Sequence, residues 1–299
     1  MVDVAVLPAD PAAAFKRAQQ GKSYWRRVWE RLRDDKVTLA VIGVLVMLLI
    51  MVVFAPWFTM HDPYTGSVLR RLKPVGTPGH WLGTDEVGRD LWARMVFGGR
   101  LSLLAGVMPV FLALLIGGFL GVAAGYVGGL VNSAIMRLTD VLYAFPSILL
   151  AIAITGILGS GLQNTILALT ISFIPPIIRI SESVTTQVRH LDFVEAARAS
   201  GAGPLTIMRY HILNNMLGPI LVYATSLISV CIILAAGLSF LGLGVTPPSA
   251  EWGLMLNNLR QALWVSPLVA ALPGVMIFIT SMCFNLMSDG LRQAMDVRL

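Results

Sequence analysis

The positions of charged residues divide the chain into long apolar stretches separated by polar segments. Five stretches contain no Asp, Glu, Lys or Arg, and they run from Val37 to His61, Leu101 to Met136, Val141 to Ile178, His211 to Ala250 and Gln261 to Ser288. A bilayer core about 30 Å thick takes about 20 apolar helical residues to cross. Each stretch is therefore long enough to span a membrane, and the pattern predicts an all-α integral membrane protein.

The third stretch is almost two spans long, and its middle has the composition of a turn. Gly156 and the run 159–161 are followed by Gln163 and Asn164. Such clusters break helices between apolar segments. We therefore predict a tight helical hairpin within residues 141–178, which brings the number of transmembrane helices to six.

Small residues repeat along the second stretch. Gly117, Gly121 and Gly125 fall four residues apart, which places them on one face of a helix. A face without side chains lets another helix approach closely. The repeat therefore predicts tight helix packing and carries no information about a substrate.

A short amphipathic segment precedes the first span. Trp25, Val28, Trp29 and Leu32 repeat with helical spacing, and charged residues occupy the other side. This pattern is typical of a helix that lies in the membrane interface. A helix packed against a partner protein is the alternative.

Composition and charge support a membrane protein. Hydrophobic residues make up 56% of the 299 residues and charged residues 13%, about half of the usual charged share. The formal net charge of +6 raises the question of nucleic-acid binding. The basic residues, however, concentrate in the N-terminal tail and in loops and form no basic face, so we predict the lipid bilayer as a partner and no nucleic acid.

The basic residues also predict the topology. When the N-terminus is placed in the cytoplasm, most Lys and Arg residues fall inside, so both termini are predicted to be cytoplasmic, with the first span retained. The predicted layout is a cytoplasmic tail with the amphipathic helix at 1–36, a first transmembrane helix at 37–58, an extracytoplasmic loop at 59–100, a five-helix core at 101–288 with a cytoplasmic loop at 179–217, and a cytoplasmic C-terminus at 289–299.

Candidate chemistry is sparse. Gly21-Lys22-Ser23 is similar to the end of a phosphate-binding loop, but Lys16 stands where such a loop needs its first glycine. The four histidines lie in loops or at span edges, and both cysteines lie in apolar runs where they pack as small hydrophobic residues. We expect no catalytic residue, no metal site and no cofactor on this chain.

The span centres contain no charged residue. Asp140 and Glu182 lie at predicted cytoplasmic ends, where Asp140 is expected to cap or orient a helix. A proton relay would place acids deep in the membrane. The pattern therefore speaks against a proton-coupled carrier.

The cytoplasmic loop between the fourth and fifth spans has the features of a helical protrusion. It predicts a helix through Val184 to Ser200, a break at 201–203 and a second helix that begins at Pro204. Glu195 lies near the end of the first helix beside two small alanines. An exposed carboxylate there suits contact with a basic group of a partner, and an ordinary surface hairpin is the alternative.

This loop resembles the signature of permease subunits of bacterial ABC importers, which reads Glu-Ala-Ala, three residues, Gly, nine residues, Ile-x-Leu-Pro. The ending His-Ile-Leu at 211–213 is similar to the dipeptide and oligopeptide branch. Asn214 stands where that branch has proline, which we expect to soften the bend before the fifth span. The residues that the resemblance assigns to ATPase coupling are Glu195, Ala196, Ala197, Arg198, Gly201, Ala202, His211 and Leu213.

Two further blocks resemble the C-type permease of the same branch. The first runs from Trp81 to Arg94 and contains an extracytoplasmic Gly-Thr-Asp-x-x-Gly-Arg-Asp motif, whose matching residues, with the arginine that follows, are Gly83, Thr84, Asp85, Gly88, Arg89, Asp90 and Arg94. The second runs from Leu238 to Val245 and continues into an outer loop with Pro247, Pro248, Glu251, Trp252 and Gly253. With three blocks in the family's order, the chain is identified as a member of this family.

The resemblance implies the type I permease fold of ABC importers in a bacterial inner membrane. It also implies that the chain forms one half of a pathway for dipeptides or oligopeptides, with a homologous second permease, one or two cytoplasmic ATPase subunits and an extracytoplasmic solute-binding protein. ATP and Mg²⁺ would then bind the ATPase subunits, and the helix near Glu195 would dock on one of them. Nickel chelates, haem or another small solute are alternative cargoes, and a stand-alone channel or secondary transporter is the alternative class.

An apolar stripe follows the last block. Its members are Trp252, Met255, Leu256, Leu259 and Leu263. The spacing predicts an external interfacial helix. Contact of the outer loop with the binding protein and packing of the stripe against lipid are both open interpretations.

Overall fold

Helices form most of the described chain. The structure is a computed structural model, and it describes residues 24–295. Its longer helices are α2 (Tyr24–Asp34), α3 (Lys36–Val53), α5 (Leu91–Val127), α6 (Gly129–Tyr143), α7 (Ser147–Leu158), α8 (Leu162–Val188), α9 (Asp192–Ala199), α11 (Leu213–Phe240), α12 (Trp252–Leu259) and α13 (Pro267–Met295). Short elements are α4 (Ala55–Phe58), η1 (Val68–Arg70), α10 (Pro204–Thr206), the π-helical turn η2 (Ile207–Ile212) and η3 (Arg260–Trp264). The phosphate-loop-like Gly21-Lys22-Ser23 and the last residues of the predicted C-terminal tail lie outside the described residues.

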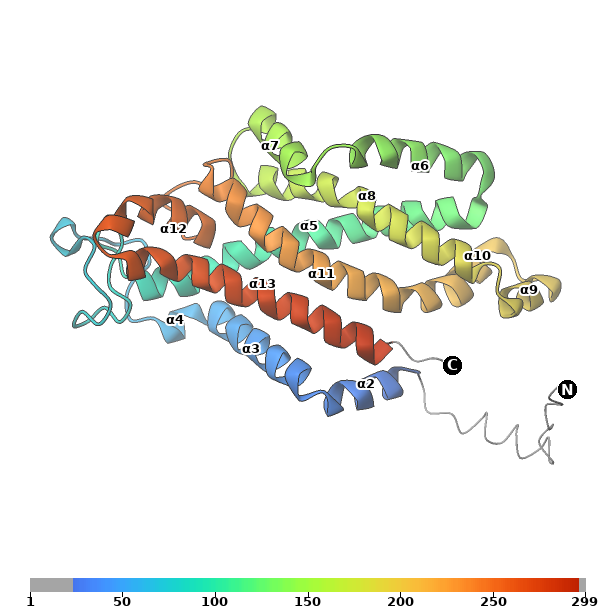
Figure 1. The fold of residues 1–299 in the computed structure, drawn as a ribbon, viewed down its shortest axis with the longest axis horizontal. Helices are drawn as coiled ribbons and strands as arrows, with labels where there is room; N and C mark the ends of the chain where they lie inside the picture. The colour runs from blue at the N-terminus through green and yellow to red at the C-terminus, as the bar shows by residue number, and fades with distance from the viewer. Residues whose placement is uncertain (1–23, 296–299) are drawn as a thin grey trace, which may run out of the picture.

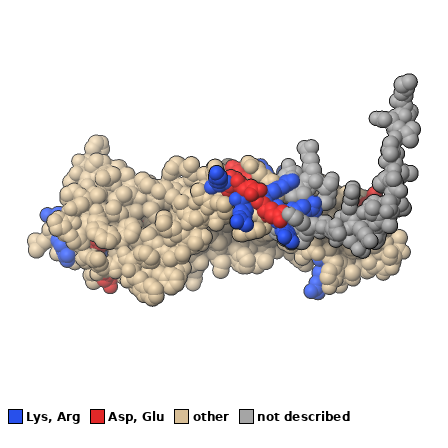
Figure 2. Space-filling view, turned by 90° about the horizontal axis from the view of Figure 1, so that it is seen from below, with Lys and Arg blue, Asp and Glu red and all other residues tan. Residues whose placement is uncertain are grey.

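The long helices run side by side along the long axis of the molecule (Figure 1). Residues 59–90 and 241–251 gather at one end, which we call the motif end, and residues 189–212 lie at the other, which we call the hairpin end. In Figure 2 a broad uncharged surface separates charged residues at the motif end from a charged cluster in the region of α2. Such a band is what a lipid-facing surface requires.

Five helical segments are long and apolar enough to cross a membrane, and the bent pair α6 and α7 makes six when it is counted as one span. The prediction of six spans is confirmed on this count. The predicted turn is also present, since α7 ends at Leu158 and α8 begins at Leu162.

The boundaries around α6 differ from the prediction. We expected one helix over 101–136, but Gly128, with a φ of 71°, ends α5 and α6 begins directly after it. The α6 helix then ends before Pro146, and α7 leaves at 83°. Proline disfavours helical backbone in the residue before it. Glycine and proline therefore decided the breaks, and the charges that we used as boundaries did not.

The α5 helix begins ten residues earlier than the charge-free stretch, and two arginines lie within it. Arg94 is buried among polar partners at the motif end. Arg100 donates from Nε to the Val52 carbonyl (2.9 Å) and from its NH2 group to the Val53 carbonyl (2.8 Å). These carbonyls end α3 and have no partner within their own helix, so the arginine satisfies them.

The predicted close packing at the glycine repeat is present between α5 and α8. A Cβ atom added to Gly121 would lie 2.5 Å from Cβ of Ser181 and 2.6 Å from the carbonyl oxygen of Ile178. One added to Gly125 would lie 2.8 Å from the carbonyl oxygen of Glu182. Only glycine allows these two helices to pack at this distance.

Both predicted interfacial helices bury apolar residues against the bundle. In α2, Val28 and Leu32 pack against Ala294 of α13, while Trp29 remains exposed. The part of the predicted stripe that lies in α12 is also internal, because Trp252, Met255 and Leu259 are almost fully buried. Leu263, which belongs to η3, is exposed. The prediction of an external interfacial helix is therefore wrong for α12: its stripe packs within the chain.

Candidate functional site

The hairpin end carries the Glu-Ala-Ala segment on a short separate helix. We predicted one helix from Val184 to Ser200, but the chain leaves helical geometry after Val188, and Leu191 is extended before α9 begins at Asp192. Arg189 fastens this break, since one of its terminal nitrogens donates to the carbonyls of Gly125 (2.8 Å) and Tyr126 (3.1 Å). The sequence offered no local signal for this contact, because its acceptors lie at the end of α5.

One buried side chain holds α9 against the bundle. Val194 is completely buried and packs in a cluster with Ile207 and Ile212 of η2. The other described residues of the helix are exposed or half-buried, and Glu195 and Arg198 are among the exposed ones. Val194 is therefore the one buried residue of α9, and most of the surface of this helix is exposed.

The predicted break after α9 is present. Gly201 has a φ of 85°, and the next helical turn begins at Pro204. The structure brings most residues of the predicted coupling segment to this end of the bundle: Glu195, Ala196, Arg198, Gly201 and Leu213 are exposed, and Ala197, Ala202 and His211 are half-buried.

The helix is continuous through Asn214, where we expected a softened bend. The helical segment runs on from Pro204 to Phe240 through the π-turn η2. The side-chain amide of Asn214 donates to the carbonyl of Tyr210 (3.0 Å), and that of Asn215 donates to the carbonyl of His211 (2.6 Å). These amides satisfy carbonyls in the widened turn, which a proline at 214 could not do.

At the motif end, Asp85 is the centre of a buried ionic network. Its Oδ2 lies 2.6 Å from Nε of Arg89 and 3.2 Å from Nε of Arg94, and the three side chains are at most 9% exposed. Its Oδ1 accepts from the backbone N–H of Val87 (3.0 Å) and of Arg89 (2.9 Å). One carboxylate thus pairs with two guanidinium groups and orders the turn that follows it, and Glu86 provides a second carboxylate, 2.9 Å from a terminal nitrogen of Arg89.

Arg94 links three segments that are distant in the sequence. Besides Asp85, its terminal nitrogens donate to the carbonyls of Pro63 (3.0 Å), Pro248 (3.4 Å) and Ser249 (3.1 Å). The guanidinium therefore joins the loop after α4, the start of α5 and the loop after α11. This arrangement explains how a charge is accommodated inside a helix of spanning length.

The remaining motif residues shape the loop backbone. Gly83 and Gly88 have φ values of 80° and 79°, and a Cβ atom would lie 2.2 Å from the Lys73 carbonyl oxygen and 2.0 Å from the Ser67 carbonyl oxygen, respectively. The Thr84 hydroxyl accepts from the backbone N–H of Lys73 (2.9 Å) and donates to the carbonyl of Arg70. The block is therefore a loop-building motif whose polar groups are directed inward.

The carboxyl of Glu251 begins α12 and is buried. It accepts from the backbone N–H groups of Gly253 (2.9 Å) and Leu254 (2.8 Å) and from the hydroxyl of Ser102 (3.1 Å). Burial raises the pKa of this carboxyl above its usual range, and the hydrogen bonds oppose the shift.

The outer loop divides into buried and exposed parts. Glu251, Trp252 and Gly253 lie inside the chain and present no contact surface, so the hypothesis of a partner contact is wrong for these three in this structure. Pro247 and Pro248 are exposed.

The fold is that of known transporters. Inward-facing structures of the MetNI methionine ABC transporter contain a chain that superposes with a TM-score of 0.56, at 21% identity, over 68% of this chain and 97% of that chain. An amino acid ABC transporter with histidines gives a TM-score of 0.51 at 17% identity, over 67% and 94%.

Sequence relatives cover almost the whole chain. A glutathione transport system permease protein, GsiD of Pectobacterium atrosepticum, is 42% identical over 95% of this chain and 94% of its own length. The protein of the same name from Shigella boydii is 40% identical over 99% and 96%.

Two family models match the chain. One describes the binding-protein-dependent transport system inner membrane component and covers residues 117–299. The other describes the N-terminal TM domain of oligopeptide transport permease C and covers residues 23–74.

The helical fold with its exposed hairpin, together with these matches, defines a membrane-embedded permease subunit of an ABC importer. The chain belongs to the family of binding-protein-dependent transport system inner membrane components. Subunits of this kind are not catalytic, and the ATPase activity lies in partner subunits.

Proposed function

We propose that this chain forms half of the translocation pathway of an ATP-driven importer of small peptides, and that α9 couples it to an ATPase subunit. The observation that carries the proposal is the exposed α9, which a single buried valine fixes to the bundle. The names of the relatives support the substrate class, because glutathione is a tripeptide.

The coupling follows from the stiffness of the hairpin end. Val194 joins α9 to η2, which is continuous with α11, and Arg189 joins the start of the hairpin to the end of α5. Movement of α9 by an ATPase subunit would therefore be passed to two spans at once. Nucleotide and the loaded binding protein would supply the free-energy difference between inward-facing and outward-facing states.

In the proposed assembly the two ends of the molecule lie on opposite sides of the membrane. The hairpin end and both termini would face the cytoplasm, and the motif end would face a solute-binding protein outside. A homologous second permease would complete the pathway, and one or two ATPase subunits would bind ATP and Mg²⁺ below it.

The coupling is tested in liposomes that contain the full complex, with the binding protein supplied outside. Glu195→Arg and Gly201→Pro should each reduce peptide uptake and peptide-stimulated ATP hydrolysis about tenfold or more, the factor that corresponds to about 1.4 kcal/mol. Asp289→Arg is the matched control, because this exposed acid of α13 lies away from α9. Uptake at the wild-type rate in both α9 variants would overturn the assignment.

The substrate class needs a separate measurement. Labelled glutathione, a dipeptide, a nickel chelate and haem should be compared in competition for uptake by the wild-type complex. We expect the two peptides to compete with each other and the nickel chelate and haem to have no effect. Uptake of nickel or haem without peptide competition would contradict the peptide proposal while leaving the coupling result intact.

A further inference from the structure

Three potential metal ligands meet at the motif end outside the Asp85 network. One ligand atom from each of His61, His80 and Asp90 can be chosen so that all three lie within 4.8 Å of one another. The two imidazole rings have their centres 4.8 Å apart and are tilted by 35° to each other. The sequence prediction of no metal site rested on spacing along the chain, and these residues come from three different segments.

The hydrogen bonds of His80 assign a role to each of its ring nitrogens. Its Nδ1 lies 2.8 Å from Oδ1 of Asp90, and its Nε2 lies 3.4 Å from a terminal nitrogen of Arg70. A guanidinium has only donors, so Nε2 accepts and Nδ1 carries the proton that is donated to Asp90. A neutral imidazole is the form that binds metal ions.

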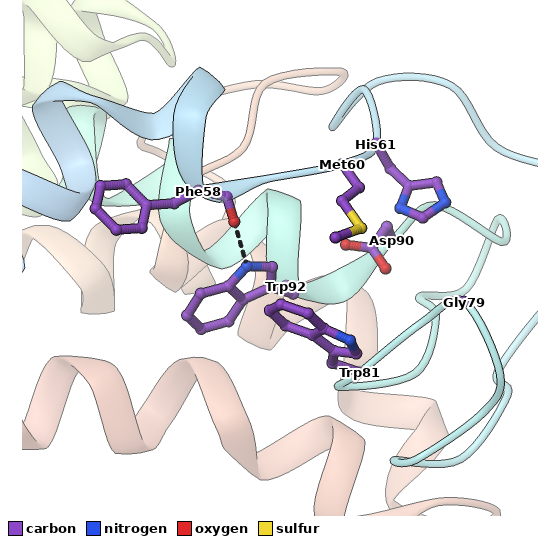
Figure 3. Close-up of a pocket in the computed structure, with 7 residues that line it drawn as sticks. All are labelled: Phe58, Met60, His61, Gly79, Trp81, Asp90 and Trp92. Atoms are coloured by element: carbon purple, nitrogen blue, oxygen red, sulfur yellow. Dashed lines mark hydrogen bonds between the residues drawn. The ribbon is translucent and has the colours of Figure 1, made fainter.

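A small cavity adjoins two of the three ligands, His61 and Asp90. It has a volume of about 20 Å³, and its lining includes His61, Asp90 and Met60 together with Trp81 and Trp92. Figure 3 shows the Met60 thioether and the Asp90 carboxylate on the same side of the cavity as the His61 ring. The cavity is large enough for one water-sized particle.

We propose that His61, His80 and Asp90 form a site for a divalent transition-metal ion such as Zn²⁺, with one ring nitrogen from each histidine, one carboxylate oxygen and a water molecule as ligands. Imidazole nitrogens select transition metals, and hard ions such as Mg²⁺ take oxygen ligands. Two histidines and one carboxylate with an open fourth position are an established zinc ligand set.

The site needs only small movements to close on an ion. Ligands of tetrahedral zinc lie about 3.3 Å apart, given bond lengths near 2.0 Å. Nδ1 of His80 and Oδ1 of Asp90, now at 2.8 Å, would have to separate slightly, and the proton of Nδ1 would have to move to Nε2, which Arg70 now faces. His61 would have to approach. His61 is half-buried and Arg70 is exposed, so the first can turn inward and the second can turn away.

Metal binding would join parts of the chain that the backbone leaves separate. His61 lies in the segment after α4, His80 lies in the loop before α5, and Asp90 is the N-cap of α5. An ion between them would fasten the first helical unit to the start of the longest helix in the described chain. The proposal does not depend on the substrate of the importer.

The test uses the purified complex with an affinity tag that contains no histidine. Zn²⁺ is titrated by calorimetry, and Co²⁺ serves as a second probe because its absorption reports tetrahedral nitrogen and oxygen ligation. Trp81 and Trp92, whose ring centres are 6.0 Å apart, provide a local fluorescence signal when Co²⁺ quenches them. We expect one saturable site and no response to Mg²⁺.

Two variants are expected to change metal affinity in opposite directions, which a general loss of folding would not do. His61→Ala removes a ligand and should weaken binding by about 100-fold or more. Arg70→Ala removes the cation that now faces His80 and should tighten binding by about threefold to tenfold. His190→Ala is the control, since this histidine lies at the hairpin end.

The outcomes are distinct. Saturable Zn²⁺ binding that is lost in His61→Ala, retained in His190→Ala and strengthened in Arg70→Ala supports the site. Absence of saturable binding, or binding that survives His61→Ala unchanged, overturns it. Each result is read in a complex whose peptide-stimulated ATP hydrolysis is measured in parallel, so a failure of the metal site is distinguishable from a failure of the transport proposal.

Discussion

The two ends of this permease both carry sequence blocks that are shared with a family, yet the structure uses them in opposite ways. At the motif end the polar residues of the block are directed inward, and Asp85 alone engages two arginines. At the hairpin end the polar residues of α9 face outward, and one apolar residue, Val194, is the buried member. A family motif therefore can serve the fold or serve a partner, and burial distinguishes the two roles.

The comparison predicts that substitutions at the two ends lower the free energy of unfolding by different amounts. The largest loss is expected at Asp85. Asp85→Asn leaves the buried Arg94 without a carboxylate and Arg89 with Glu86 alone, which should cost about 3–5 kcal/mol of unfolding free energy. The thermal unfolding midpoint of the complex in detergent should fall strongly. Glu195→Gln, at the exposed end, should leave that midpoint within the range of ordinary surface substitutions, about 0.5 kcal/mol.

A similar loss for both substitutions would remove the distinction between the ends. A small loss for Asp85→Asn would show that Arg89 and Arg94 find other partners or water when the carboxylate is gone.

One glycine at each end allows the same Gly→Ala substitution to be compared between the motif end and the hairpin end. Gly88 and Gly201 have φ values of 79° and 85°, but only Gly88 is also crowded, with Ser67 backbone atoms where a Cβ would lie. Gly201→Ala should cost about 1–2 kcal/mol for the left-handed backbone alone. Gly88→Ala should cost more, because the loop must also move, and unfolding midpoints of the two variants give the order directly.

The expected order holds only if the crowding at Gly88 cannot relax. Equal midpoints for the two alanine variants would mean that the loop at 67–88 shifts without cost, and the picture of a rigid motif end would then be wrong.

The smallest effect is a pH dependence at Glu251. Burial raises the pKa of its carboxyl above the ordinary value of 4.5, so the folded state binds this proton more tightly than the unfolded state. The sign follows from linkage: stability is greatest below 4.5 and falls as the pH rises through the folded pKa. Glu251→Gln cannot ionise, so its advantage over the wild type should grow with pH across this window.

Unfolding midpoints of the wild type and of Glu251→Gln between pH 4.5 and 8 provide the measurement. A difference that stays constant with pH would indicate that Glu251 has the same proton affinity in both states, and that its hydrogen bonds to Ser102 and to the start of α12 fully offset burial.

Local signals in the sequence were sufficient for several elements. The turn between α7 and α8, the break at Gly201 and the restart at Pro204 are all present, because glycine and proline restrict the backbone wherever they stand. The presence of a close helix contact on α5 also followed from three glycines at helical spacing, but the identity of its partner, α8, did not. These features depend on residues within a few positions of one another.

Other expectations failed for a common reason. Arg94 and Arg100 lie inside α5 because carbonyls and a carboxylate from distant segments accept their hydrogen bonds. The stripe of α12 is buried because α5, α11 and α13 surround it. In each case the environment of a residue depends on segments that are far away in the chain.

The sequence by itself determined that the chain is helical, how many times it is able to cross a membrane, where glycine and proline interrupt the helices, and which family its blocks match. The tertiary structure alone decided which charges are buried, which partners neutralise them, and that His61, His80 and Asp90 share one place. The physical reason is the distance along the chain over which each effect acts. Backbone preference and hydropathy act over a few residues, whereas the burial of a charge is tolerated only where the folded chain brings an opposite charge or a free hydrogen-bonding group to it.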